Sequence, residues 1–428
     1  MALLDPGVLR SDQRGRPWGT ALSTSVESVK SRPLTSLRLV SIDAVRGAVM
    51  VIMALDHVRD FVHSAAGQFR PEDLARTTPA LFLTRWITHF CAPVFMLYAG
   101  TAAFLWARRG GRSKRELSRF LFNRGLWLIF LELTVVRFGM FFNFKYDLVI
   151  LSVIWALGCS MMALAALAAL VFLPERVLLT VSVAVIAFHN LLDGINAAVF
   201  GPARWIWVVL HQPAPVTIAG RTVIAGYSLV PWIAVMAAGY CLGRVFTLEP
   251  DARRTVLLRL GLGLIIAFVL LRAVNVYGDP APWSPQRTTT LTVLSFLNCT
   301  KYPPSLSFLL MTIGPALLAT AWVERIRVSG ENPIVVFGRV PLFYFVFHLI
   351  AIHAIAAVLI WLAYGNANLF WNAAPAAGGP RQAFPNGFGF NLWVTYAVWI
   401  SVVAIMYPAC RWFARLKQRR RDWWLSYC

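Results

Sequence analysis

The sequence predicts an all-α, polytopic integral membrane protein with about ten transmembrane helices and both termini in the cytoplasm. Of its 428 residues, 58% are hydrophobic and only 14% are charged, and the mean hydropathy is +0.63. These values lie well outside the range of soluble globular proteins. Apolar stretches of about 20 residues, the length that crosses a hydrocarbon core, recur along the chain. Lysine and arginine gather in alternate connections between these stretches.

The apolar stretches define the predicted transmembrane spans. Long connections near 200–221, 276–303 and 364–390 are rich in Pro, Gly and aromatic residues, and segments of this length often form an entrance or a lid. The predicted spans cover residues 42–64, 80–107, 119–143, 147–172, 177–199, 222–246, 254–275, 304–323, 337–363 and 391–413.

The distribution of basic residues sets the predicted orientation, because positively charged connections stay in the cytoplasm. Such connections follow the second, sixth and eighth predicted spans, and a basic tail follows the last span. Both termini are therefore expected on the cytoplasmic side. We expect residues 1–37 to form a disordered cytoplasmic tail, residues 38–416 the membrane domain, and residues 417–428 a basic cytoplasmic tail.

Composition and motifs exclude several classes of function. The formal net charge of +21 lies in short segments between apolar runs, so nucleic-acid binding is not needed to explain it. The six cysteines form no Cys-x-x-Cys pair and support neither a metal site nor a disulfide framework. No P-loop, zinc-protease, nucleophile-elbow or dinucleotide motif occurs in a suitable context. The chemistry is thereby narrowed to what histidine, carboxylate and arginine can do.

The first predicted helix holds the largest group of ionisable residues inside a span, and such residues are costly in a bilayer. Arg46 and His57 are eleven residues apart, which places them on one helix face with about 16 Å of rise between them. Asp60, three residues after His57, could accept a proton from one ring nitrogen and leave the other as a base. In the alternative interpretation, which explains His57 less well, Arg46 extends to the cytoplasmic interface, and an interfacial cluster forms from Asp56, Arg59, Asp60 and His63.

Other ionisable residues lie at middle to outer depth in their predicted spans, which suggests a single polar chamber. Each of them could instead be a hydrogen-bonded residue between helices. These residues are His89, Glu132, His189, His348 and His353.

Two basic residues begin helices in the second half of the chain. Lys301 precedes the eighth predicted span from the outer side, beside the positive end of a helix dipole. It could contact a substrate or a buried carboxylate, or lie at the interface. Arg339 begins the ninth span from the cytoplasm and could bind a phosphate, although a positive-inside anchor explains it almost as well.

Five segments together resemble a known family. In their order along the chain they are similar to the bacterial branch of the heparan-α-glucosaminide N-acetyltransferase catalytic-domain family, and the resemblance runs from about residue 38 to 414. The Arg46-to-His57 spacing also resembles the first helix of membrane acyltransferases that O-acetylate surface polysaccharides. The five segments are 38–47 (RLVSIDAVRG), 92–100 (APVFMLYAG), 231–240 (PWIAVMAAGY), 301–306 (KYPPSL) and 338–344 (GRVPLFY).

The resemblance implies a transmembrane acyltransferase, which takes an acetyl or other acyl group from cytoplasmic acyl-CoA and delivers it to an amino or hydroxyl sugar outside. In the lysosomal enzyme of this family the catalytic histidine lies between the first two helices, and His63 and His89 are the nearest candidates here. We expect catalytic roles for His57, Asp60, His89, Glu132 and His353, binding of the CoA phosphates by Arg46, Arg109, Arg112 and Arg339, and acceptor contacts by Lys301 and His63.

No metal is required by this chemistry. The expected partners are membrane lipid, acyl-CoA and a glycan or small sugar acceptor, with a homo-oligomer left open, and the expected location is the bacterial-type cytoplasmic (inner) membrane. Two competing hypotheses remain. In one, the buried histidines and carboxylates form the proton relay of a transporter for a small anionic substrate. In the other, the chain is an inactive relative that acts as a membrane scaffold.

Overall fold

The computed structural model describes residues 39–170, 174–326, 328–420, 422 and 425. The predicted tail 1–37 lies outside the described residues. Of the predicted tail 417–428, residues 421, 423, 424 and 426–428 also lie outside them. In the first half, the helices are α1 (Val40–Val62), α2 (Pro79–Trp86), α3 (Cys91–Arg109), α4 (Lys114–Leu131), α5 (Arg137–Phe141), α6 (Val153–Leu170), α7 (Glu175–Phe188) and α8 (Arg204–Leu210). In the second half they are α9 (Leu229–Leu242), α10 (Pro250–Val274), α11 (Thr289–Leu297), α12 (Leu306–Ile326), α13 (Pro333–Arg339), α14 (Pro341–Tyr364) and α15 (Leu392–Arg419).

The mostly helical architecture confirms the predicted class in its main feature. Within the described residues, seven continuous helical segments are long and apolar enough to cross a membrane. They include α2 and α3, which a short 3-10 turn joins into one segment, Pro79–Arg109. The helices α1, α4 and α6 lie where three further spans were predicted. The total of about ten crossings and the cytoplasmic position of the termini stay predictions.

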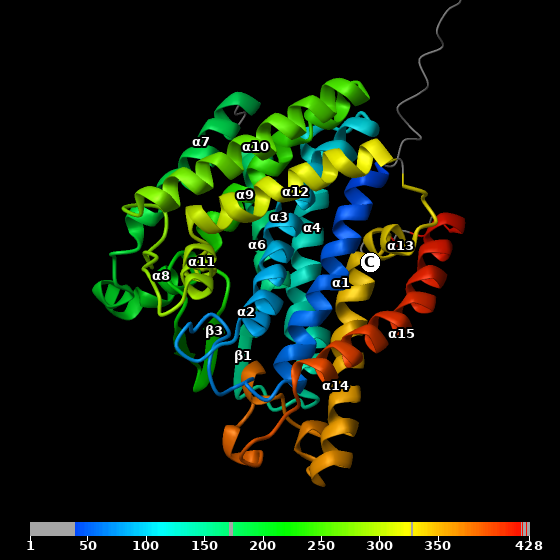
Figure 1. Cartoon of the computed structure of the whole chain (residues 1–428). Coiled ribbons are helices and arrows are strands. Elements are labelled where there is room, and N and C mark those ends of the chain that lie inside the picture. Colours follow the sequence, from blue (N-terminus) through cyan, green and yellow to red (C-terminus); the bar gives the residue numbers. More distant parts are fainter. Residues whose placement is uncertain (1–38, 171–173, 327, 421, 423–424, 426–428) are drawn as a thin grey trace, which may run out of the picture. The chain divides into compact units, whose positions relative to one another are not determined.

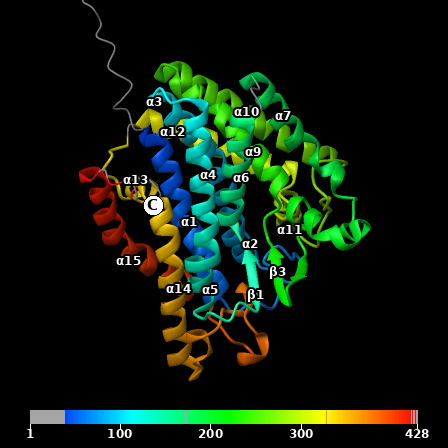
Figure 2. The same cartoon turned by 180° about the vertical axis from the view of Figure 1, so that it is seen from behind.

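α1 carries five charged side chains, and it lies inside the bundle rather than at its surface. It packs against α3, α12, α13, α14 and α15, and both views show it beside α14 (Figure 1 and Figure 2). Most of its residues are buried, including Asp43 and Arg59. A helix with this many ionisable side chains is tolerated at membrane depth when protein surrounds it. The packing therefore explains how α1 can carry the polar residues seen in its sequence.

Glycines allow α1 and α3 to approach their neighbours closely. A Cβ atom at Gly47 would overlap the carbonyl group of Ile334 in α13, and one at Gly338 would overlap that of Asp43 in α1. Gly100 of α3 lies in the same way against the backbone of α9. Small residues at helix crossings are typical of membrane bundles, where close van der Waals packing drives association. The glycines of the motifs 38–47 and 338–344 thus have a packing role.

A small three-stranded sheet departs from the all-α prediction. Its strands are β1 (Leu148–Leu151), β2 (Pro215–Ile218) and β3 (Arg221–Ala225), in the order β1-β3-β2. β1 and β3 are parallel, and β2 and β3 form an antiparallel hairpin. These segments are rich in Val, Ile and Thr, which favour strands. The predicted spans 147–172 and 222–246 were therefore too long at their beginnings, since α6 starts at Val153 and α9 at Leu229.

Candidate active site

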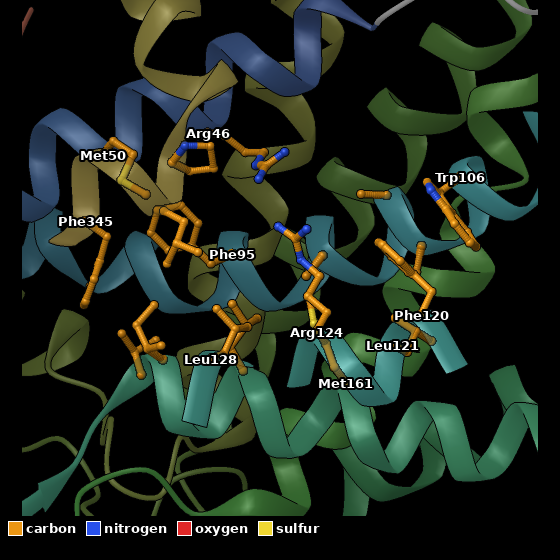
Figure 3. A pocket seen from close by; sticks show the side chains of 18 residues that line it. Arg46, Met50, Phe95, Trp106, Phe120, Leu121, Arg124, Leu128, Met161 and Phe345 are labelled. Carbon is orange, nitrogen blue, oxygen red and sulfur yellow. The ribbon is translucent and has the colours of Figure 1, made fainter. Parts of the chain in front are cut away.

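A cavity of about 380 Å³ opens between α1, α3, α4, α6 and α14. Its walls are largely aliphatic and aromatic, and its two charged side chains are Arg46 of α1 and Arg124 of α4. Figure 3 shows these two guanidinium groups facing each other, with Phe95, Leu128 and Phe345 on one side of them and Trp106 and Phe120 on the other. The cavity therefore combines a site for an anion with an apolar channel.

His57 contacts Phe345, one of the residues that line this cavity. The ring of Phe345 lines the cavity and meets the imidazole of His57 edge-on, with ring centroids 6.2 Å apart. Arg46 also lines the cavity, whereas His57 meets it only through this contact with Phe345. The prediction that Arg46 and His57 share one face of α1 stays a prediction.

His57 has a histidine partner from α14. Its Nδ1 lies 2.8 Å from Nε2 of His348, and the two rings stack with centroids 5.0 Å apart. His348 is fully buried, and its Nδ1 lies 2.9 Å from the carbonyl oxygen of Tyr344. The predicted partner of His57 was Asp60, and the structure corrects this. Asp60 instead accepts a hydrogen bond from Arg59 at 2.7 Å.

An ionic network surrounds the C-terminal end of α1, and we define it as Asp56, Arg59, Asp60, Glu72 and Arg85. Nη2 of Arg59 donates to Asp56 at 3.0 Å and to Asp60 at 2.7 Å. Arg85 of α2 pairs with Asp56 and donates from Nε to Glu72 at 2.8 Å. The charges within the network nearly balance, which is what partly buried ion pairs require. The network ties α1, α2 and the connection between them into one unit.

His89 lies beside the ionic network, at the turn between α2 and α3. Its side chain is 1% exposed, and its Nε2 lies 3.6 Å from Oε1 of Glu72. Its ring packs against Phe308 of α12. Among the described residues, neither ring nitrogen has a hydrogen-bond partner. His89 is therefore a buried imidazole next to the carboxylate of Glu72.

Lys301 approaches the same region from the connection between α11 and α12. This connection contains a cis peptide bond between Tyr302 and Pro303, and Asp279 holds it by accepting hydrogen bonds from the backbone of Thr300 and the hydroxyl of Ser305. The Lys301 side chain is buried. Burial raises the pKa of the Tyr302 phenol, but the charges of Lys301 and Arg85 lower it more, so that the pKa lies below its usual value. Lys301 and Arg85 therefore both lie close enough to Tyr302 to lower the pKa of its phenol.

Glu132 and His353 lie apart from His57 and serve the fold. The carboxylate of Glu132 accepts hydrogen bonds from the backbone N–H groups of Ser152 and Trp155, at the beginning of α6. The two ring nitrogens of His353 face the carbonyl oxygens of Gly139 and Leu369, at 2.9 and 2.6 Å. Their polar atoms are engaged with backbone, so neither side chain orients His57.

His63 and His189 also bind backbone groups. His63 ends α1, and its Nδ1 accepts a hydrogen bond from the N–H of Ala65 at 3.1 Å. Nε2 of His189 lies 2.8 Å from the carbonyl oxygen of Pro304, which helps to hold the connection that carries Lys301. The histidines expected in one polar chamber are thus distributed over several places, because packing between helices, and not depth, decides which of them meet.

The model of the family described as "Heparan-alpha-glucosaminide N-acetyltransferase, catalytic" matches residues 38–271, more than half of the 428 residues. The chain belongs to this family. Among curated proteins, none matches it significantly. Membership in the family, together with the apolar helices, indicates a membrane acetyltransferase. The matched residues include α1, the ionic network and Arg124, whereas Lys301 and His348 lie beyond them.

The other basic residues predicted to bind the donor of this acetyltransferase family lie near the same end of the bundle as Arg46. Arg109 is exposed at the end of α3. Arg112 donates to the carbonyl oxygen of Trp106 at 2.5 Å and covers its ring, and Trp106 lines the cavity. Arg339 ends α13 and is half-buried. Of these three residues Arg112 contacts the cavity wall through Trp106, while Arg46 and Arg124 line the cavity itself.

Sequence analysis missed three residues of this site. Arg85 and Arg124 lie inside the predicted spans 80–107 and 119–143, so the cost of a charge at membrane depth should have singled them out. Glu72 lies in a polar connection, where a carboxylate is ordinary, and no pattern in the sequence pointed to it. His348 was noted for its depth, but its pairing with His57 depends on how α14 packs on α1.

Proposed function

We propose that this protein is a transmembrane acyltransferase that moves an acetyl or other acyl group from acyl-CoA to an amino or hydroxyl group of a sugar. The donor enters from the cytoplasm, and the acceptor lies on the outer side. The observation that carries the proposal is the cavity, which holds Arg46 and Arg124 and has Phe345, a contact of His57, in its wall. Membership in an acetyltransferase family supports it.

Arg46 and Arg124 would bind the phosphate groups of the donor. Guanidinium groups donate hydrogen bonds in a planar fork that fits phosphate oxygens, and a phosphate between two such groups accepts from both. Arg109, Arg112 and Arg339 would add positive potential around the mouth and raise the local concentration of an anionic donor. In this scheme Arg46 and Arg124 bind the donor directly, and the other three arginines attract it to the cavity.

The apolar part of the cavity would hold the pantetheine arm and the thioester. Arg46 and His57 are separated by about 16 Å of helix rise, so an extended chain held at Arg46 would reach inward toward His57. Phe95, Leu128 and Phe345 line this path. Apolar walls keep water away from the thioester and thereby suppress its hydrolysis.

His57 would act as the base of the reaction. It takes the proton from the acceptor amine or hydroxyl, the acceptor attacks the carbonyl carbon of the thioester, and the carbon–sulfur bond breaks. The leaving sulfur takes up the proton, so His57 returns to its neutral form. In a variant of this scheme, His57 carries the acyl group briefly before the acceptor does. Lys301, His63 and His89 would contact the acceptor or the groups around it.

The proposal is tested by incubating the purified full-length protein in nanodiscs with acetyl-CoA labelled in the acetyl group. We expect label on glucosamine or on an oligosaccharide acceptor, and loss of this transfer in His57→Ala. His211→Asn is the matched control, because His211 pairs with Asp193 and belongs to neither the cavity nor the ionic network. A wild-type protein that does not bind acetyl-CoA would overturn the proposed function.

A further inference from the structure

The pair of His57 and His348 has a defined direction of hydrogen bonding. The carbonyl oxygen of Tyr344 can only accept, and it lies 2.9 Å from Nδ1 of His348. A neutral His348 must therefore carry its proton on Nδ1. With the proton on the other nitrogen, the lone pair of Nδ1 would face the lone pairs of a carbonyl oxygen inside a buried site, and both groups would lose their hydrogen bond.

The same reasoning extends from His348 to His57. Because Nδ1 of His348 is protonated, its Nε2 is an acceptor, and this atom lies 2.8 Å from Nδ1 of His57. A neutral His57 must then carry its own proton on Nδ1 and donate it to His348. Nε2 of His57 is left with a lone pair, which is the form that a base or a nucleophile needs.

Aromatic packing holds both rings in this orientation. The ring of His348 stacks on the ring of Tyr344, one turn away on α14, with centroids 5.0 Å apart and an angle of 11° between the planes. Phe345 meets the rings of both His57 and His348 edge-on. Rotation of either imidazole would break these contacts as well as the hydrogen bonds, so the pair is fixed before any substrate binds.

Carboxylates on α1 do not take the place of His348. Asp56 is engaged by Arg59 and Arg85, and Asp60 by Arg59. In hydrolase triads a carboxylate accepts the Nδ1 proton of the catalytic histidine, and it thereby selects the tautomer that leaves Nε2 as the base. Here the acceptor at that position is the neutral imidazole of His348.

We propose that His348 is a positioning residue that holds the proton of His57 on Nδ1, so that Nε2 of His57 is the atom that takes the proton of the acceptor. This inference rests on the proposed acyl transfer. In the reaction, the proton moves from the acceptor to Nε2 of His57, the new bond from the acceptor to the acyl carbon forms, and the carbon–sulfur bond breaks. The proton then passes from Nε2 to the leaving sulfur, while Nδ1 stays hydrogen-bonded to His348.

Nuclear magnetic resonance of the full-length protein, labelled with ¹⁵N in histidine and held in nanodiscs, tests the tautomer directly. The signals of His57 are assigned by their loss in His57→Ala. We expect a protonated Nδ1 and an unprotonated Nε2 in the wild type without substrate. A His57 with its proton on Nε2 overturns the inference. This measurement needs no substrate and no turnover, so its outcome is separate from that of the proposed function.

Two variants of His348 test the effect on the reaction. His348→Phe keeps an aromatic ring and removes the acceptor, whereas His348→Gln keeps an oxygen that can accept from Nδ1 of His57. We expect His348→Phe to lower kcat by roughly 100-fold or more, the usual contribution of a positioned base, with little change in KM for acetyl-CoA. His348→Gln should recover much of the loss, and in His348→Phe the ¹⁵N signals should show that the single tautomer is lost.

Acetyl-CoA binding and thermal stability are measured for both variants, so that a folding defect is recognised. If His348→Phe binds acetyl-CoA and transfers acetyl at the wild-type rate, His348 is not a positioning residue. If both variants are equally inactive, the oxygen of His348→Gln does not restore the reaction. This result contradicts the role of His348 as acceptor for His57, even where the wild type has the expected tautomer. Absence of transfer in the wild type itself would instead contradict the proposed function.

Discussion

Arg85 of α2 forms an ion pair with Asp56 of α1, the residue directly before His57 in the sequence. Their side chains are only 10% and 13% exposed. Arg85 also donates from Nε to Glu72 at 2.8 Å, so a single guanidinium serves two carboxylates. The connection between α1 and α2, which carries Glu72, is thereby fastened to the part of α1 that carries His57. The position of His57 thus depends on ion pairs that do not touch His57 itself.

Replacing Arg85 should strongly destabilise the protein. Arg85→Met leaves Asp56 and Glu72 partly buried without their shared partner, and breaking a buried pair in this way costs about 3–5 kcal/mol. Unfolding in detergent, followed by heat and by chaotrope, measures the loss. The matched control is Arg244→Met, whose pair with Glu175 is exposed (65% and 40%) and should contribute about 0–1 kcal/mol. Equal losses in the two variants would show that Arg85 has no special structural role.

The stability of the protein should fall in acid because of Glu72. Burial raises the pKa of its carboxyl, but the charge and hydrogen bond of Arg85 and the nearby imidazole of His89 lower it more, so that the pKa lies well below its usual value. A carboxyl with a lowered pKa in the folded state stabilises the protein above its unfolded pKa of about 4.3, and this stabilisation is lost as the pH falls below that value.

The variant Glu72→Gln isolates this contribution. At pH 6 to 7 the variant should unfold at a lower temperature than the wild type, because Arg85 and His89 lose a charged partner. Below about pH 4 the carboxyl of the unfolded wild type takes up a proton while the folded one stays charged, so the stabilisation declines steadily as the pH falls and the two melting temperatures should approach each other. Thermal unfolding at a series of pH values measures the difference. A difference that stays constant across this range would contradict the assigned role of Glu72.

The sequence predicted the helices and their polar residues better than the contacts between them. Periodicity along one helix predicts Arg46 and His57 on one side of α1, and in the structure Arg46 lines the cavity while His57 contacts Phe345 in its wall. The partner of His57 was predicted wrongly. Asp60 is close to His57 in sequence, but the neighbouring Arg59 offers a full charge and holds its carboxylate.

Lateral contacts between helices could not be predicted, because they depend on close approach of distant segments. His348 meets His57 only where α14 and α13 pack on α1, and Gly47 and Gly338 permit the contact between α1 and α13. Depth alone therefore grouped His353 and Glu132 with His57. In the structure their polar atoms meet backbone groups elsewhere, which the sequence pattern does not encode.

Glu132 should matter for stability rather than for chemistry. Its carboxylate accepts from two N–H groups at the beginning of α6, which would otherwise lack partners. Glu132→Ala should lower the free energy of unfolding by about 1–3 kcal/mol, whereas Glu132→Gln keeps one acceptor oxygen and should lose less. Thermal unfolding and the rate of acetyl transfer are measured on the same samples. A Glu132→Ala variant of wild-type stability that fails to transfer acetyl would show instead that the carboxylate acts in the reaction.

Arg46 and Arg124 should recognise the phosphate groups of the donor. We compare acetyl-CoA with acetyl-pantetheine, which has the same thioester arm without phosphates. In Arg46→Gln and Arg124→Gln, KM for acetyl-CoA should rise by roughly 10-fold to 100-fold, since a hydrogen bond to a charged group contributes about 1.5–3 kcal/mol. KM for acetyl-pantetheine should change little, because its binding relies on the apolar wall of the cavity.

The matched control for this comparison is Arg109→Gln, because Arg109 is exposed at the end of α3 and does not line the cavity. Its effect should be smaller and should disappear at high ionic strength, since an exposed charge attracts the donor only through a screened field. The losses in Arg46→Gln and Arg124→Gln should persist at high salt. If these variants weaken acetyl-CoA and acetyl-pantetheine equally, then the two arginines maintain the shape of the cavity and the phosphates are bound elsewhere.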